Sequence, residues 1–167
     1  MSTLAVTINT QLRVVETFTA DEMTTLPASR RSFDNTDFDT RTALSATTTP
    51  AVTKWHGKEY EFAAGVVILD LQALANEIGD VVDMVGLELQ AIMINNLSTT
   101  NTITLDSGVA NGYVLTGGAA HDIVILPGST WEHTFNNQLA QDVDGTHDTL
   151  HFIGTNGEDM EIAIVAG

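Results

Sequence analysis

LELQAIMINNLSTTNTITLD, residues 87–106, contains two short apolar runs separated by a polar loop. In the first run, apolar and polar residues alternate with the two-residue period of a β-strand. Toward its end Ile92 and Ile94 make the second face apolar as well, which predicts a central strand covered on both faces. The intervening Asn and Ser residues favour a turn. The stretch therefore predicts two neighbouring strands of an antiparallel sheet.

The same pattern of short apolar runs and turn residues continues through residues 59–167. The spacing of the runs is typical of an antiparallel β-sandwich or barrel with about eight strands. The runs are residues 60–71, 87–95, 102–106, 113–116, 122–126, 130–135, 149–154 and 160–166. We expect only one short helix, a turn or two over residues 71–79 that ends at Gly79. The predicted fold class is all-β, an antiparallel β-sandwich.

Residues 1–58 differ from the rest of the chain and predict an extended Thr-rich N-terminal arm. Large apolar residues become rare after position 20, and Pro27 and Pro50 interrupt longer strands. The first part of the arm, residues 4–19, alternates well enough for one or two strands. The sequence therefore divides into an arm, residues 1–58, and an acidic β-sandwich domain, residues 59–167.

The charges follow the same division. The chain has a formal net charge of −16, yet residues 1–58 hold six basic and six acidic residues. Residues 59–167 contain sixteen acids and no Lys or Arg. Such a domain repels phosphate backbones, so we expect no nucleic-acid partner. The acidic surface is explained either by solubility alone or by a basic partner.

Two further classes of protein are disfavoured by the sequence. No stretch reaches the roughly 18 unbroken apolar residues of a transmembrane helix, so we expect no membrane partner. The N-terminus lacks the basic start and the apolar block of a signal peptide, which predicts a protein made in the cytoplasm.

The chain has no cysteine, which excludes disulfides, thiolate metal sites and cysteine nucleophiles.

Catalytic motifs are absent from the sequence, and we expect no enzyme activity, no cofactor and no resident metal. Neither GxSxG, HExxH nor a Gly-rich phosphate loop occurs. His147 and His151 are four residues apart in a predicted strand, where that spacing separates them by about 13 Å. His121 and His133 each lie alone beside turn residues. The segment 126–136 resembles the second cupin motif only superficially, and the first cupin motif is missing.

Two binding sites remain open from the residues alone. Asp142, Asp144 and Asp148 surround Gly145 in a loop whose oxygens suit calcium, but the loop lacks the bidentate Glu of a calcium-hand loop, and an ordinary acidic turn explains these residues more simply. Four aromatic residues are candidates for a sugar-binding platform, as in lectin-like sandwiches, or for core and interface anchors. They are Trp55, Tyr60, Tyr113 and Trp131.

The run of residues 66–115, together with the Thr-rich leader, resembles a pattern found in small virion proteins of tailed phages. The matching features are turns and strand starts. They are Thr48–Pro50, the Asp-Leu-x-x-Leu of residues 70–74, the Gly-Leu-x-x-Gln of residues 86–90, the Asn-rich loop 95–101 and the Ala-Asn-Gly-Tyr of residues 110–113. The Pro127-Gly128 turn, Gly154 and the final Val165–Gly167 fit the same layout. The resemblance covers about two thirds of the chain.

The resemblance implies a jelly-roll-like sandwich that decorates or cements the capsid, often as a trimer. The implied partners are the major capsid protein and further copies of this chain, and the implied location is the surface of the virion. The arm would bind neighbouring subunits, and the residues we single out in it are Arg13, Arg30, Arg31 and Arg41. A tail or fibre component with the same fold and a carbohydrate-binding module remain alternatives.

Overall fold

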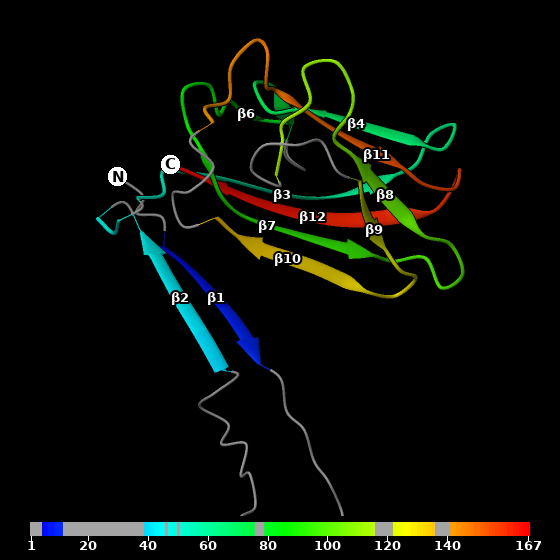
Figure 1. Cartoon of the computed structure of the whole chain (residues 1–167), viewed down its shortest axis with the longest axis horizontal. Helices are drawn as coiled ribbons and strands as arrows, with labels where there is room; N and C mark the ends of the chain where they lie inside the picture. The colour runs from blue at the N-terminus through cyan, green and yellow to red at the C-terminus, as the bar shows by residue number, and fades with distance from the viewer. Residues whose placement is uncertain are drawn as a thin grey trace, which may run out of the picture.

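Two four-stranded antiparallel sheets pack face to face in a computed structural model of the chain (Figure 1). The structure describes residues 5–11, 39–45, 47–49, 51–75, 79–115, 122–135 and 141–167. The first sheet has the order β10 (Thr130–Thr134), β7 (Leu89–Asn96), β12 (Asp159–Ala166), β3 (Lys54–Glu61). The second sheet has the order β4 (Val66–Asp70), β11 (Thr149–Ile153), β8 (Ile103–Asp106), β9 (Ile123–Ile125).

The path of the chain through these sheets is that of a jelly roll. Each successive strand from β3 to β12 lies in the opposite sheet, except that β8 and β9 pair directly and the short β5 and β6 form a separate sheet. Eight strands in two such sheets, built from two Greek keys, define a jelly roll. The predicted all-β sandwich is confirmed, together with its jelly-roll topology.

The core lies between the two sheets and is built from their inner faces. Ile92 and Ile94 of β7 are buried, and they lie directly opposite Ile164 and Ile162 of β12. From the other sheet the inner side chains of β4, β8 and β11 contribute Leu, Val and Phe to the same cluster. Because directly opposed residues share a face of the sheet, one strand register buries all these side chains together.

The run of residues 60–71 forms two strands where the sequence predicted one. β3 ends at Glu61 and β4 begins at Val66, with Ala64 and Gly65 between them at φ values of 54° and 80°. Two consecutive positive φ angles make a tight turn, which the hydrogen bond from Val66 N to the Ala63 carbonyl closes at 3.2 Å, and the chain passes there from the first sheet to the second. Conversely, residues 113–115, which lie within a predicted strand, form no strand, although Gly112 makes an isolated bridge to Thr149. The two differences leave eight strands in the sandwich.

Ala64 occupies a left-handed backbone conformation that favours Asn or Gly, so we expect Ala64→Asn to stabilise the protein. The substitution creates an Asn-Gly turn and should raise the free energy of unfolding by about 1 kcal/mol. The Ala64 backbone N–H, which donates to Asn156 Oδ1 at 2.7 Å, is retained. Urea denaturation measures the change, with Ala63→Asn as the control outside the positive-φ pair. Equal effects of the two substitutions would contradict the explanation.

The helix expected over residues 71–79 is wrong for the part of this segment that the structure describes. Residues 71–73 form a turn, and β5 (Leu74–Ala75) pairs with β6 (Val81–Val82). Asp70 closes the turn, since its carboxylate accepts a hydrogen bond from Gln72 N and its carbonyl accepts one from Ala73 N. Leu71 and Leu74 are both buried, a three-residue spacing that a turn produces as readily as a helix.

The N-terminal segment contributes a separate two-stranded antiparallel sheet, which we call the ribbon. It consists of β1 (Ala5–Gln11) and β2 (Asp39–Ser45), and Figure 1 shows it extending away from the sandwich. The sandwich itself begins at Lys54, because β3 pairs with β12 from Lys54↔Ala166 to Glu61↔Asp159. The expected boundary after residue 58 therefore falls inside β3.

Candidate interaction surface

The outer face of the second sheet carries exposed apolar side chains, and we call it the apolar face. Ile68, Val124 and Ile153 are 64%, 58% and 43% exposed. The register places Val66 opposite Ile153, Ile153 opposite Thr104, and Thr104 opposite Val124, so one row crosses all four strands. Single exposed apolar residues are ordinary on a soluble protein, but a contiguous set is characteristic of an interaction site.

A polar pair lies in the row of the apolar face that contains Ile68, next to the row of Ile153. His151 stands directly between Ile68 of β4 and Asp106 of β8 in the register. Its Nδ1 is 3.5 Å from Asp106 Oδ2, and the two side chains are 17% and 27% exposed.

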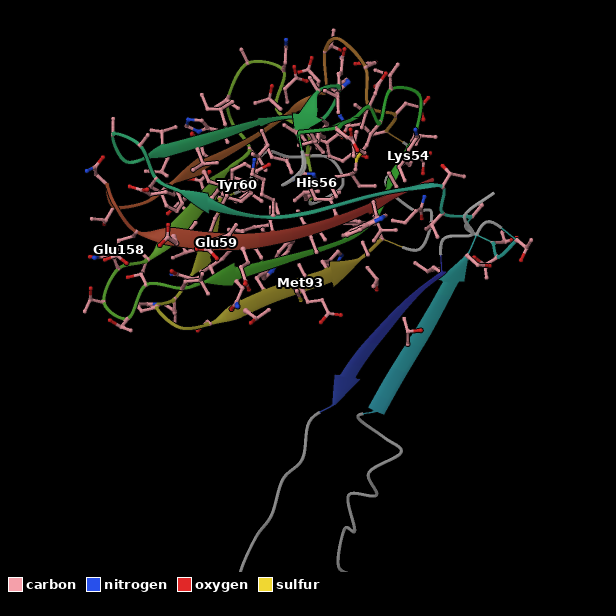
Figure 2. All side chains as sticks on the ribbon, turned by 180° about the vertical axis from the view of Figure 1, so that it is seen from behind. Lys54, His56, Glu59, Tyr60, Met93 and Glu158 are labelled. Atoms are coloured by element: carbon pink, nitrogen blue, oxygen red, sulfur yellow. The ribbon has the colours of Figure 1, made fainter. Side chains whose placement is uncertain are left out.

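Among the described residues, the outer face of the first sheet is covered at one end. There Leu44 of β2 and Val52 pack against Ala91 and Val165, and all four side chains are buried. Farther along this face Met93 is exposed, and the acidic Glu59 follows on β3 (Figure 2). β7 is therefore an inner strand of its sheet, as expected, but the prediction that both its faces are covered is confirmed only in part.

The arginines of the predicted arm are placed only in part. Arg41 lies in β2 of the ribbon, opposite Asn9 of β1. Arg13, Arg30 and Arg31 lie outside the described residues. The four arginines as a shared binding site therefore remain a prediction, whereas the ribbon strands and their attachment at Leu44 are part of the structure.

His56, which the sequence did not single out, is fully buried on the inner side of β3. Its Nε2 is 2.8 Å from Tyr60 Oη, and its Nδ1 has no hydrogen-bond partner among the described residues. Burial, and secondarily the positive charge of Lys58, lowers the pKa of His56. Burial also raises the pKa of Tyr60. Figure 2 labels His56 and Tyr60 along this strand. The arrangement favours an uncharged core histidine.

Because its pKa is lowered in the folded state, His56 should make the protein sensitive to acid. The unfolded chain takes up a proton near pH 6.5, whereas the folded protein does so only at lower pH. The free energy of unfolding therefore does not depend on the titration of His56 above about pH 6.5, and it decreases as the pH drops below this value. We expect His56→Gln, which can still bond Tyr60 but cannot titrate, to lose less stability between pH 7.5 and 5.5. Equal losses in urea denaturation would contradict this.

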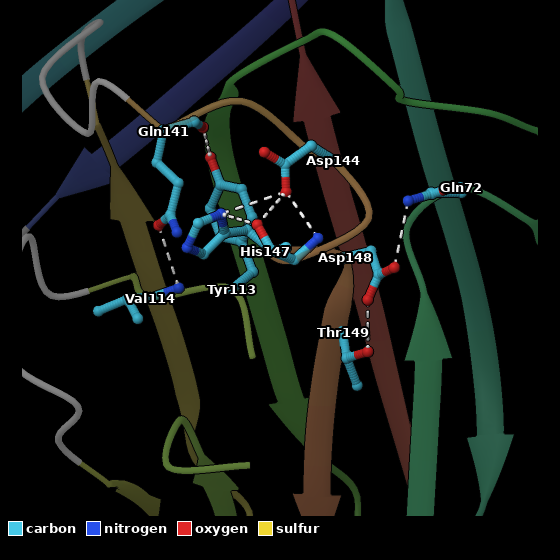
Figure 3. Close-up of polar contacts among 9 residues, drawn as sticks. Gln72, Tyr113, Val114, Gln141, Asp144, His147, Asp148 and Thr149 are labelled. Atoms are coloured by element: carbon cyan, nitrogen blue, oxygen red, sulfur yellow. Dashed lines mark hydrogen bonds and ion pairs between the residues drawn. The ribbon is translucent and has the colours of Figure 1, made fainter. Parts of the chain in front are cut away.

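Two carboxylates of the acidic loop of residues 142–148, those of Asp144 and Asp148, accept hydrogen bonds from other residues of the chain (Figure 3). Asp144 Oδ1 accepts from both N and Oγ1 of Thr146 at 2.7 Å and lies 3.2 Å from His147 Nδ1. The hydrogen bonds from Thr146 are the main cause that lowers the pKa of Asp144. Asp148 accepts from Gln72 Nε2 at 3.1 Å. In the described part of the chain, no three His, Asp or Glu side chains gather as metal ligands.

The hydroxyl of Tyr113 holds the backbone just before the same loop. It donates to the Gln141 carbonyl at 2.6 Å and accepts from Leu89 N at 3.1 Å. Burial is the main cause that raises the pKa of Tyr113 to about 12. Nearby, Asn111 has a φ of 59°, and its carbonyl accepts from the backbone N–H groups of Asp148 and Thr149. The Ala-Asn-Gly-Tyr sequence of residues 110–113 therefore has a structural role.

The candidate sugar-binding aromatics do not form one platform. Tyr113 is buried, and Tyr60 and Trp131 are partly buried against the core. Trp55 is 57% exposed and lies on the outer side of the first sheet over Gly57, where an added Cβ would be 2.9 Å from the indole ring. Trp131 instead stacks on His133, with ring centroids 5.8 Å apart.

The remaining histidines show no shared site. His147 and His151 contact different carboxylates, Asp144 and Asp106, and His121 lies outside the described residues. His133 is exposed on β10 between the rings of Trp131 and Phe135.

In the described residues, no helix is long and apolar enough to cross a membrane.

Sequence reasoning missed the apolar face, although its signal was present. The runs VVIL (residues 66–69) and IVIL (residues 123–126) are continuously apolar, a pattern that normally indicates a strand buried on both faces. In the structure Val67, Leu69 and Ile125 are buried in the core and Ile123 packs against it, whereas Ile68, Val124 and Leu126 are exposed. No protein-family model, curated protein or solved structure matches this chain.

Proposed function

We propose that this chain is a structural protein of a tailed-phage particle, which decorates or cements the capsid by binding the major capsid protein and further copies of itself. The observation that carries the proposal is the apolar face, exposed on a sandwich whose sequence otherwise is strongly acidic. A contiguous apolar surface that remains in water is stabilised when a partner covers it. The sequence pattern that resembles small phage virion proteins is the reason for proposing a tailed-phage particle.

The ribbon supports the same proposal. An isolated two-stranded sheet is marginally stable in water, and this one is attached to the sandwich through Leu44. Strands that project from a domain gain stability when a neighbouring subunit covers them. On a closed lattice, many such weak contacts act together, so each copy is held more tightly than one contact would hold it. In this proposal the protein works entirely through binding, as a trimer on the virion surface, without a catalytic step.

Counting copies in purified particles tests the proposal. We expect quantitative mass spectrometry of virions from the phage that encodes this chain to find it in numbers comparable with the major capsid protein. A few copies per particle would instead assign the chain to the tail or a fibre. Its absence from purified virions would refute the structural role. Binding of the purified chain in a glycan screen would favour a carbohydrate-binding module.

A further inference from the structure

The four strands of the second sheet bring carboxylates as well as apolar side chains to the apolar face. Asp70 is exposed at the end of β4, two residues beyond Ile68 and therefore on the same side of the strand. Asp106 faces the same way beside His151. Asp122 is exposed just before β9. The apolar row thus has a negatively charged margin.

No side chain of the sandwich beyond β3 can neutralise this margin permanently. Residues 59–167 contain no Lys or Arg, and His151 is the one positively ionisable group within the register of the face as described. A carboxylate that loses water at an interface is costly unless a cation pairs with it. A protein that covers this face should therefore supply Lys or Arg where Asp70 and Asp106 lie.

Within the part of the chain that the structure describes, a second copy does not meet this requirement. Face-to-face pairing of two copies would bring aspartates against aspartates. The basic residues Lys54 and Lys58 lie on β3, in the other sheet. The ribbon strands offer no excess of positive charge either, since β1 is uncharged and β2 contains one Asp and one Arg.

We propose that the apolar face is the docking site for a different protein, one whose contact surface is apolar at its centre and basic at its margin. This inference rests on the proposed function, within which that protein is a component of the capsid. The apolar row of Val66, Ile153 and Val124 with the adjacent Ile68 forms the centre of the contact. Asp70 and Asp106 meet the basic margin, which fixes the orientation of the bound protein.

Matched substitutions test the apolar centre. Capsids prepared without this chain are incubated with the full-length protein, and bound protein is measured by co-sedimentation. We expect the double substitution Ile68→Thr and Ile153→Thr to weaken binding at least about tenfold, because it removes apolar contacts from the middle of the interface. The control replaces Val81 and Val85 with Thr, because they are 64% and 52% exposed but lie outside the second sheet. The control should bind like the wild type.

A second pair of variants tests the charged margin. Asp70 and Asp83 each accept a hydrogen bond from the backbone N–H two residues later, at 2.9 Å, and both are exposed. Asn preserves that bond and removes the charge. We expect Asp70→Asn to weaken capsid binding several-fold and to reduce its dependence on salt, whereas Asp83→Asn changes neither.

The outcomes separate this inference from the proposed function. If wild-type protein does not bind the capsids, the proposed function fails. If it binds and both double variants bind equally well, the capsid attaches elsewhere and the inference is overturned. Tighter binding by Asp70→Asn would show that the partner's margin is not basic. If the purified chain self-associates, and Ile68→Thr with Ile153→Thr abolishes that association while capsid binding persists, the face belongs to a second copy and the inference fails.

Discussion

Replacing Phe62 with Ala is expected to lower the free energy of unfolding by about 3–5 kcal/mol, the largest loss we predict for one side chain. Phe62 is fully buried at the corner where the chain leaves β3 for the second sheet. Its backbone N–H donates to the Glu158 carbonyl, and its own carbonyl accepts from Gly157 N. These bonds hold the backbone in place, so the structure cannot collapse to fill the cavity that the ring leaves.

Urea denaturation followed by tryptophan fluorescence measures the loss. Val81→Ala is the matched control. Val81 is also an apolar residue, it lies in strand β6, and its side chain is 64% exposed. Its change in stability should stay within about 0.5 kcal/mol. A loss below about 1 kcal/mol for Phe62→Ala would show that this corner is not part of the packed core.

Gly154→Val is expected to destabilise the protein by about 3 kcal/mol, at the upper end for overpacked cores. A Cβ at Gly154 would lie 2.7–2.8 Å from three atoms of the Phe62 ring. The ring is enclosed by the core and cannot turn away. Gly154 N also donates to the Gly65 carbonyl at 2.9 Å, so the glycine backbone is held at this distance.

A double-mutant cycle checks the cause of this loss. If the clash with Phe62 is responsible, Gly154→Val should cost clearly less in a Phe62→Leu background, because the smaller side chain leaves room for the methyl groups. The coupling energy should exceed about 0.5 kcal/mol. Additive effects of the two substitutions would contradict the explanation and point to the backbone at Gly154 instead.

The sandwich was predictable because local periodicity and burial agree over most of the chain. Alternation in residues 87–95 and 160–166 marks strands that do line the core. The turn at Ala64 and Gly65 was missed because Ala rarely adopts a positive φ, so Gly65 is the single turn-favouring residue in the middle of that apolar run. The expected helix failed because Leu74 gains more from pairing opposite Val82 and from burial than from helix propensity.

The candidate surface was less predictable than the fold. Continuous apolar runs do not distinguish strands covered on both sides from strands with one exposed apolar face, since that difference depends on what packs outside the sheet. Ile68 and Leu69 are neighbours of similar chemistry, yet Ile68 is 64% exposed and Leu69 is 3% exposed. Likewise, the burial of His56 was not predictable from the sequence, because it depends on the hydrogen bond that Tyr60 forms with it in the folded structure.

The position of β12 has a consequence for how the protein is made. β12 is the last of the described strands along the chain, yet it lies inside the first sheet and pairs with both β3 and β7. During translation, β3 and β7 are synthesised long before the strand that joins them. The nascent chain therefore exposes the inner side chains of both strands until residues 159–166 emerge. Such distant pairings fold slowly, and the apolar side chains that they bury favour aggregation for as long as they stay exposed.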